Sequence, residues 1–399
     1  MQTSMNLEFK KQQILTLIIL AVLFGSSSIT NLGSSEIPLD SAIEKLRYVL
    51  ILTALMTLLL LSRFDIWGFP KKQLPLIIVW ILLGFISVIS GVVNDDLVSV
   101  RDGLWFMIIS PMIFFYSLPK LMKQYANFLL ATSLFLGLLP YIVMSLLLHP
   151  INQFQGHSYT GYAGVFPNPN DLGFTSVTMA SGLFIILIGS LSAKKRLWYV
   201  LPIILCLIFL FVIIILANAR TSLIAFFGML SIFMWRLFQK PGFLIKFVSS
   251  IALSISAILL LADEQFYLFF LNNLNQLQDK EGLSGREYIW NKTFEDVKLL
   301  GNGADYFELN FGLGGHNTII NTLGTIGIIA AFLMLFLASL SIFYAYLYFK
   351  THSKTDHYAI APLVITICFW ITSMGEGMFS ALGTAMTVAY FLCIGIIVT

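Results

Sequence analysis

The sequence predicts an all-α polytopic membrane protein whose helices support one long polar loop. Hydrophobic residues make up 58% of the 399-residue chain and charged residues only 11%, whereas a soluble domain carries about 25% charged residues. Apolar runs recur along the whole sequence, and the extended polar interruption covers residues 262–316. We therefore expect a single transmembrane domain over residues 1–399, with residues 262–316 as an outward-facing catalytic loop that contains short helices.

Twelve apolar runs approach the roughly 20 residues that a membrane-spanning helix needs. They cover residues 13–30, 46–62, 74–93, 102–118, 127–148, 172–191, 197–216, 221–238, 243–261, 317–349, 358–375 and 380–398. The ninth run is the weakest, because Lys246 lies near its start. The last two runs are separated only by the residues Met374 to Met378, so they also fit one hairpin that dips into the membrane.

The distribution of charge predicts the orientation of these spans. With twelve spans both termini share one side, and that side carries 15 of the 23 basic residues but only three of the 20 acidic residues. The basic residues on it are Lys10, Lys11, Arg63, Lys71, Lys72, Lys120, Lys123, Lys194, Lys195, Arg196, Arg236, Lys240, Lys246, Lys350 and Lys354. Because lysine and arginine accumulate in cytoplasmic loops, both termini are expected in the cytoplasm and the long loop outside.

Several chemistries are not indicated by the sequence. The three cysteines lie inside apolar runs and have no metal-ligand spacing. No nucleotide-binding glycine loop and no zinc motif is present. The carboxylate pairs Asp95–Asp96 and Glu295–Asp296 are sequence neighbours, and neighbours on a helix point apart. We therefore expect no metal, no cofactor and no nucleic-acid partner.

The long loop is predicted to contain two helices. Residues 264–278 place apolar side chains on one face and amides opposite, which is typical of an amphipathic helix at a membrane surface. A second helix is expected to begin at Ser284, which forms a capping box with Glu287, and to end at Gly301. Arg286 then lies in the first helical turn, where free backbone amides favour an anion.

Three residues are candidates for chemistry, each with a purely structural alternative. His316 joins the loop to the next span and either anchors that helix or acts as a general base, since the unperturbed histidine pKa is about 6.5. Arg220 follows a tight outer turn and either anchors lipid headgroups or binds a phosphate. Arg286 either pairs with Glu287 or Asp305, or binds an anion.

Other residues are weaker candidates. Arg101 is expected to pair with one of its neighbouring aspartates, and Asn168 and Asn170 are typical turn residues. Glu376 is a carboxylate between two glycines near the outer surface, with no role that the sequence explains.

A polar stripe marks the helix that follows His316. Asn317, Asn321 and Thr325 recur at intervals of four residues on an otherwise apolar run. Such a stripe is expected to face the protein interior, and Asn317 is a supporting candidate for the site beside His316.

Four local patterns occur in a fixed order. They are Pro167-Asn168-Pro169-Asn170 before a span, Ala219-Arg220-Thr221 at a tight outer turn, Gly285-Arg286 with Trp290 followed by Gly301-x-Gly303, and His316-Asn317 with Gly324 and Gly327 in the next helix. In order, spacing and sidedness they resemble the O-antigen ligase and polymerase superfamily of bacterial envelope polysaccharide enzymes. The resemblance covers about residues 160–330.

The resemblance implies a metal-independent membrane glycosyltransferase with a GT-C-like fold. Its donor would be a glycan on undecaprenyl diphosphate, and transfer would occur on the outer face of the bacterial cytoplasmic membrane. The family's histidine falls on His316, and its two arginines, which would bind the diphosphate, fall on Arg220 and Arg286. A flippase and a chain-length regulator of the same pathway are expected partners, together with the lipid bilayer.

The sequence is compatible with three functions. We predict a polymerase that joins lipid-linked repeat units into capsule, exopolysaccharide or O-antigen, because the outer loop is modest in size. A ligase that moves finished polysaccharide to another acceptor would use the same donor chemistry. A transporter or flippase would call for polar residues near the bilayer midplane and an internal repeat, and the sequence shows neither.

Overall fold

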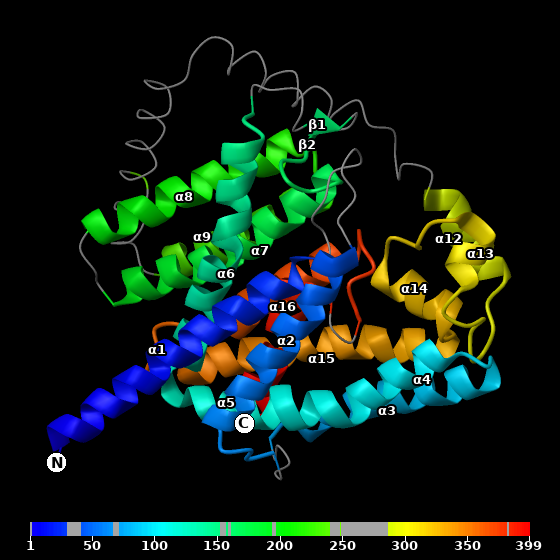
Figure 1. The fold of residues 1–399 in the computed structure, drawn as a ribbon, viewed down its shortest axis with the longest axis horizontal. Helices are drawn as coiled ribbons and strands as arrows, with labels where there is room; N and C mark the ends of the chain where they lie inside the picture. Colours follow the sequence, from blue (N-terminus) through cyan, green and yellow to red (C-terminus); the bar gives the residue numbers. More distant parts are fainter. Residues whose placement is uncertain are drawn as a thin grey trace.

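The computed structural model describes residues 2–29, 41–66, 72–151, 157–158, 161–193, 197–239, 248, 286–380 and 383–399. These residues are mostly helical, and seven of their helices are long and apolar enough to cross a membrane (Figure 1). The all-α membrane class is therefore confirmed. The predicted span at 243–261, the amphipathic helix at 264–278 and the capping residue Ser284 lie outside the described residues.

The first part of the chain consists of long helices joined to shorter helical segments. They are α1 (Gln2–Ser27), α2 (Ser41–Leu61), α3 (Leu74–Val93), α4 (Leu97–Leu104), the π-helical segments η2 (Trp105–Ile109) and η3 (Pro111–Ser117), α5 (Leu118–Met122), the 3-10 turn η4 (Lys123–Tyr125) and α6 (Ala126–Leu148). Residues 97–122 form one continuous candidate span. Pro111 lies where η2 gives way to η3, and proline cannot donate the amide hydrogen of a regular helix.

A short hairpin and three long helices follow. They are β1 (His157–Ser158), β2 (Gly161–Tyr162), α7 (Pro169–Ser192), α8 (Leu197–Leu216) and α9 (Arg220–Phe238). The strands are antiparallel, with His157 opposite Tyr162 and Ser158 opposite Gly161. The predicted spans at 74–93, 127–148, 172–191, 197–216 and 221–238 coincide with α3, α6, α7, α8 and α9 to within three residues.

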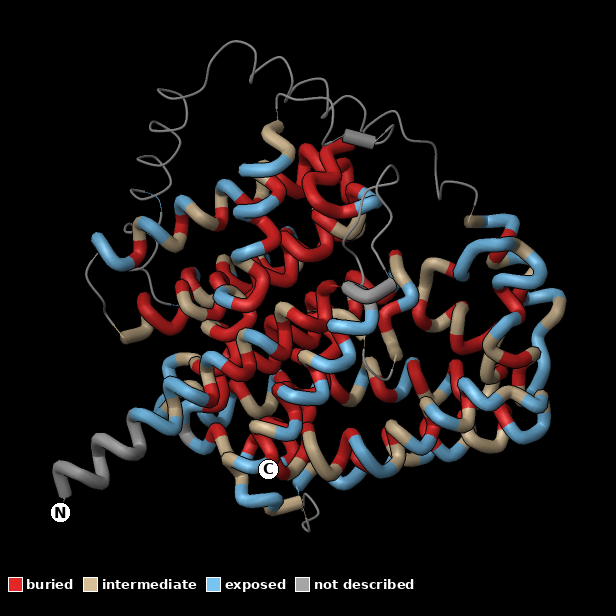
Figure 2. Tube along the Cα trace, in the orientation of Figure 1, coloured by how far each residue is buried: buried red, intermediate tan, exposed pale blue. Residues whose placement is uncertain are grey.

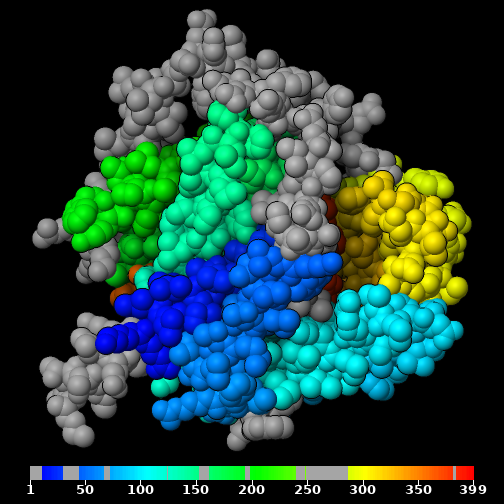
Figure 3. Space-filling model, viewed as in Figure 1, coloured from blue at the N-terminus to red at the C-terminus, as the bar shows by residue number. Residues whose placement is uncertain are grey.

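The last third of the chain combines short outer helices with the centre of the bundle. Its elements are α12 (Arg286–Glu295), α13 (Tyr306–Phe311), α14 (Thr318–Thr325), α15 (Ile328–His352), α16 (Ala361–Ser373) and α17 (Ala385–Val398). The helices α12, α13 and α14 gather at one end of the molecule, beside the turn between α3 and α4 (Figures 1 and 3). We call this the outer end, after the orientation that the distribution of charge in the sequence predicts.

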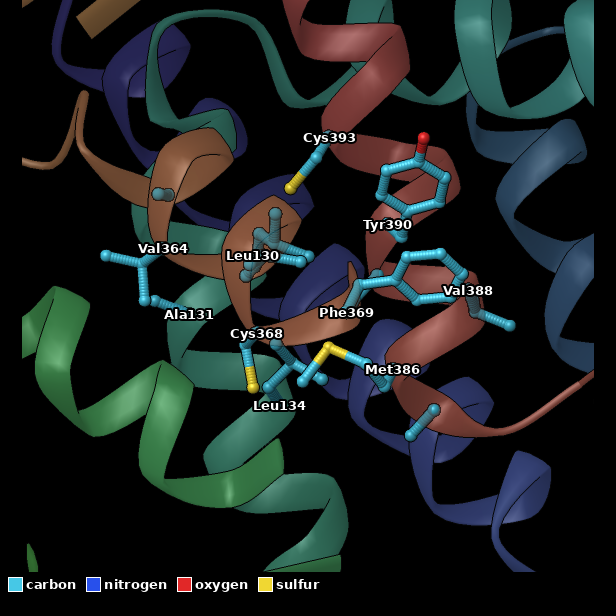
Figure 4. Close-up of a cluster of buried hydrophobic side chains, with 14 of the residues drawn as sticks. Leu130, Ala131, Leu134, Val364, Cys368, Phe369, Met386, Val388, Tyr390 and Cys393 are labelled. Atoms are coloured by element: carbon cyan, nitrogen blue, oxygen red, sulfur yellow. The ribbon is translucent and has the colours of Figure 1, made fainter. Parts of the chain in front are cut away.

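The core of the molecule is built around α7, α16 and α17. Every residue of α17 is buried, and most residues of α7 are buried as well (Figure 2). Phe369 of α16 stacks on Tyr390 of α17 with ring centroids 4.1 Å apart, and both pack in a cluster that includes Leu134 of α6 (Figure 4).

Membrane helices associate through close packing rather than through expulsion of water. A Cβ on Gly137 of α6 would lie 2.4 Å from the carbonyl oxygen of Ala21 in α1, and one on Gly103 would lie 2.6 Å from that of Gly84.

One face of α15 carries three phenylalanines that are more than half exposed: Phe332, Phe336 and Phe343. They recur at spacings of four and seven residues, so they form a face suited to contact lipid.

Two predicted spans prove shorter than the sequence suggested. The runs at 358–375 and 380–398 form helices of only 13 and 14 residues, each about 20 Å long. The described residues between these helices, 374–380 and 383–384, form a non-helical connector instead. Such backbone is tolerated at membrane depth only where protein or a water-filled cavity surrounds it, and this connector lines a cavity at the outer end.

The predicted span at 317–349 is wrong as one helix, because it breaks between α14 and α15. Gly327 has φ of 108° at the break, and a Cβ there would lie 2.4 Å from the amide nitrogen of Gly301. Gly301 does not end a helix as predicted: α12 ends at Glu295. The amides of Asn302 and Gly303 instead donate to the last carbonyls of α14, with N···O distances of 2.9 and 3.0 Å. The carbonyls of Gly324 and Thr325 lose their helical partners at the break, and these two amides replace them.

The turn between α3 and α4 holds this outer segment in place. The Asp96 carboxylate caps α4 by accepting from Val98 and Ser99, and its Oδ2 also accepts from the Ala304 amide at 2.7 Å. Ser90 and Asn94 donate to the carbonyl of Leu300 at 2.7 and 3.0 Å. Burial acts to raise the pKa of Asp96, but the hydrogen bonds that its carboxylate accepts from Ser99, Ala304 and Val98 together outweigh burial and leave the pKa below its usual value of 3.8.

We predict that Asp96→Asn lowers stability at neutral pH by about 1–3 kcal/mol, because asparagine keeps only one of the two oxygens that accept from the start of α4 and from the part-buried Ala304 amide. The carboxylate stabilises the fold above the pKa of the unfolded chain, and this contribution is lost as pH falls through the lower folded pKa. Thermal unfolding in detergent should therefore show a gap between variant and wild type that closes in acid. Asp95→Asn, in the same turn but exposed, is the control, and an equal loss there would contradict the assignment.

Candidate functional site

Five separate segments meet at the outer end. They are the starts of α7 and α9, the helix α12, the loop that precedes α14, and the connector between α16 and α17. Glu376 of the connector lies at their centre. Its side chain is 35% exposed, so it is reached by solvent while it contacts protein on several sides.

The Glu376 carboxylate bridges two of the predicted site residues. Its Oε2 lies 3.2 Å from Nδ1 of His316, and its Oε1 lies 3.6 Å from Nη2 of Arg286. Nη1 of Arg286 donates to the carbonyl of Gly375 at 2.9 Å. Arg286 therefore pairs with Glu376, and not with Glu287 or Asp305 as the structural alternative suggested.

The geometry indicates which nitrogen of His316 is available for proton transfer. A carboxylate can only accept, so the hydrogen shared with Glu376 resides on Nδ1 of the imidazole. In the neutral ring the lone pair is then on Nε2. The His316 side chain is 32% exposed.

The backbone around His316 is held from both sides. Trp290 of α12 donates from Nε1 to the carbonyl of Gly315 at 2.8 Å, and the amide of Gly315 donates to Asn321 Oδ1 at 2.7 Å. His316 itself adopts the left-handed conformation, with φ of 48°. Asn317 follows as the N-cap of α14, accepting from two backbone amides. Two residues of the predicted polar stripe therefore have a structural role. Asn317 caps the start of α14, and Asn321 positions the backbone of Gly315 beside His316.

The connector is attached directly to the start of α14. Asn317 Nδ2 donates to the carbonyl of Met374 at 3.2 Å. Thr318 donates from Oγ1 to the carbonyl of Glu376 at 3.2 Å and accepts from the amide of Met378 at 2.9 Å. These contacts hold His316 and Glu376 close together, although the two residues lie 60 positions apart in the chain.

Two glycines allow Glu376 to reach this position. A Cβ on Gly375 would lie 2.1 Å from Oγ1 of Thr221 at the start of α9, and one on Gly377 would lie 2.0 Å from Nδ2 of Asn321 in α14. Glu376 therefore lies between α9 and α14 at distances where a Cβ on either neighbouring residue would require Thr221 or Asn321 to move.

Arg220 faces the same region from α9. It is the first residue of that helix and follows Asn218, whose φ of 55° makes the tight turn. Arg220, Arg286, Trp290 and Glu376 line one cavity of about 400 Å³. The cavity also borders Thr221 at the start of α9, where backbone amides lack helical acceptors. Two permanent positive charges and a helix N-terminus therefore surround one space.

A smaller cavity of about 220 Å³ lies on the other side of Glu376. Asn168, Asn170 and Asp171 line it, and Asn170 and Glu376 line both cavities. Asn168 is the N-cap of α7 and accepts from the Asn170 amide at 3.0 Å, as expected of a turn residue. Asp171 was missed by the sequence reasoning, although a carboxylate at the start of an apolar span is a detectable signal.

Arg101 is not part of this arrangement. Its guanidinium pairs with Asp102 at 2.9 Å and its side chain is 70% exposed. Neither cavity is lined by Arg101. Among the described residues, no group of three histidine, cysteine, aspartate or glutamate side chains is arranged to hold a metal ion.

Comparison with known proteins adds no assignment. The chain matches no protein-family model, and no curated protein matches it. The resemblance drawn from the local patterns therefore stays a prediction, and the function is argued from the site.

We predict that Gly375→Ala destabilises the protein by about 1–3 kcal/mol, because the new methyl group meets the short, β-branched side chain of Thr221. Differential scanning fluorimetry of the purified protein in detergent would measure the loss as a lower melting temperature. Gly314→Ala is the matched control, because a Cβ there meets no atom within 4 Å. If both variants melt at the wild-type temperature, the close approach of connector and α9 is wrong.

Proposed function

We propose that this protein is a glycosyltransferase that polymerises undecaprenyl-diphosphate-linked oligosaccharide repeat units into capsule, exopolysaccharide or O-antigen. The observation that carries the proposal is the placement of Glu376 between His316 and Arg286, at the wall of the cavity that Arg220 also lines. A base, a positioning carboxylate and two phosphate-binding cations are the groups that such a transfer requires.

The donor diphosphate is assigned to the cavity of about 400 Å³. Arg220 and Arg286 supply fixed positive charge that matches phosphate oxygens, and the start of α9 adds backbone amides. Phe174, Ile224 and Ile371 line the same cavity and suit the first isoprene units. A partly exposed ion pair is worth only about 0–1 kcal/mol, so Arg286 exchanges Glu376 for a phosphate at little cost.

The chemical step is a single displacement. The acceptor hydroxyl loses its proton to Nε2 of His316 while its oxygen attacks the anomeric carbon of the donor sugar. The bond between that carbon and the phosphate oxygen breaks, and undecaprenyl diphosphate leaves with the bonding electrons. Arg220 and Arg286 stabilise the negative charge that develops on it. Glu376 stabilises the imidazolium that forms at His316, so the step needs no metal.

The proposed orientation follows from charge. Lys72, Lys120, Lys123 and Lys350 lie at or beyond the ends of spans remote from the site. Because basic residues accumulate on the cytoplasmic side, that end is assigned to the cytoplasm and the site to the outer face of the bacterial cytoplasmic membrane. We include in this proposal twelve spans, cytoplasmic termini, a GT-C-like arrangement, and a flippase and chain-length regulator as partners.

The direct test uses the purified protein with undecaprenyl-diphosphate-linked repeat units and follows product length on a gel. Wild type should give a ladder, and His316→Ala should slow transfer by about 10²–10⁴-fold. His357→Ala, an exposed histidine remote from the site, should leave the ladder unchanged.

Each other outcome has a distinct meaning. Transfer of one finished chain to an added second acceptor, without a ladder, would make the enzyme a ligase. An unchanged ladder from His316→Ala would overturn His316 as the base but not the reaction. Release of no undecaprenyl diphosphate with any acceptor would overturn glycosyl transfer.

The two arginines should differ in effect from Arg101. Arg220→Gln and Arg286→Gln are each expected to lower kcat/KM by about 10²–10³-fold, because one preorganised donor to the leaving group is lost. Lysine at either position should restore part of the rate as a point charge. Arg101→Gln is the control and should keep the wild-type rate, since Arg101 pairs with Asp102 outside both cavities. Equal losses in all three variants would indicate a general effect of surface charge.

A further inference from the structure

A further cavity lies at the end of the molecule opposite to the proposed active site. Its volume is about 850 Å³, within the range of about 300–1,000 Å³ typical of ligand sites. Three membrane-spanning segments end around it: Lys72 lies just before Leu74–Val93, Lys123 just after Leu97–Met122, and His352 closes Ile328–His352. Segment ends mark the boundary between hydrocarbon and water, so the cavity is at the level of lipid headgroups.

The cavity is strongly positive at its rim. Lys72, Lys120 and Lys123 line it, and the described residues that line it include no aspartate or glutamate. Lys120 already pairs with Asp65 and donates to the hydroxyl of Tyr116. Within the described part of the chain, no salt bridge involves Lys72 or Lys123, and both are exposed. Lys72 and Lys123 therefore border one space whose described lining, which also includes Thr399, contains no aspartate or glutamate side chain.

The deeper walls are apolar and firmly held. Leu347 of α15 and Ile396 and Ile397 of α17 line the cavity. Tyr348 stacks on His352 with ring centroids 4.3 Å apart. Its hydroxyl also accepts from Asn127 Nδ2 at 3.1 Å, so the wall is fixed before a ligand arrives. A positive rim over apolar walls, at the end of membrane spans, has the chemistry of an anionic lipid: a phosphate for the lysines and acyl chains for the walls.

We propose that this cavity binds the phosphate group of an anionic membrane lipid such as phosphatidylglycerol. The site is separate from the glycosyl-transfer site and stands whether or not that function holds, because it depends only on the membrane class and on the residues around this cavity. Bound lipid would join the ends of α3, α5, α15 and α17 at the end where few protein contacts of opposite charge are available.

The test measures the melting temperature of the delipidated full-length protein in detergent micelles. Phosphatidylglycerol, phosphatidylcholine or inorganic phosphate is added to separate samples. Phosphatidylglycerol should raise the melting temperature of wild type by about 5 °C at saturation, and phosphatidylcholine should not. The double variant Lys72→Gln/Lys123→Gln should lose at least half of this shift. The matched control Lys350→Gln/Lys354→Gln removes two exposed lysines that do not line the cavity, and it should keep the shift.

Three results would overturn the proposal. The double variant could retain the full shift, or the control could lose as much as the double variant, which would indicate unspecific attraction. Protection of wild type by inorganic phosphate equal to that by phosphatidylglycerol would exclude a lipid as the source of the phosphate. Native mass spectrometry of bound phosphatidylglycerol gives a second measurement, and its persistence on the double variant would contradict the site even if that variant melts early.

Discussion

The outer end of the molecule depends on one carboxylate that is held between an imidazole and a guanidinium. Glu376 can occupy this position because Gly375 and Gly377 let the connector approach α9 and α14 more closely than any side chain would allow. The three side chains are between 22% and 35% exposed, and the contact contributes little stability by itself. Its importance is geometric: it joins the imidazole of His316 to the guanidinium of Arg286, the groups proposed as proton acceptor and phosphate ligand.

Much of the fold followed from hydrophobic runs, because a span in lipid must be apolar along its whole length. The boundaries failed where protein replaces lipid. The short helices α16 and α17 are buried in the bundle, so the 20-residue rule does not govern them. The break at Gly327 could not be predicted for a related reason. Apolar residues continue across it in the sequence, and the backbone carbonyls that it leaves without helical partners accept from the distant segment after Gly301.

The site could be predicted in its parts but not in its assembly. Arg220 and His316 were recognisable because each is a charged or titratable residue at the end of an apolar run, and Arg286 because it lies at the start of a helix in the polar loop, where free backbone amides favour an anion. The pairing of His316 and Arg286 with Glu376 could not be read from the sequence, because the spacing of 60 residues between His316 and Glu376 carries no periodic signal. Arg101 looked similar in sequence, yet it pairs with its neighbour Asp102 and stays outside the cavities.

The central claim is that Glu376 acts through His316, and a double-mutant cycle tests it most directly. The measured quantity is the rate of sugar transfer from an undecaprenyl-diphosphate-linked oligosaccharide. Glu376→Gln alone should slow transfer by roughly 2–150-fold, which corresponds to a coupling of about 0.5–3 kcal/mol. In the His316→Ala background the same substitution should cost almost nothing further, since the group it positions is gone. Losses that multiply across the two variants would contradict the claim and give Glu376 an independent role.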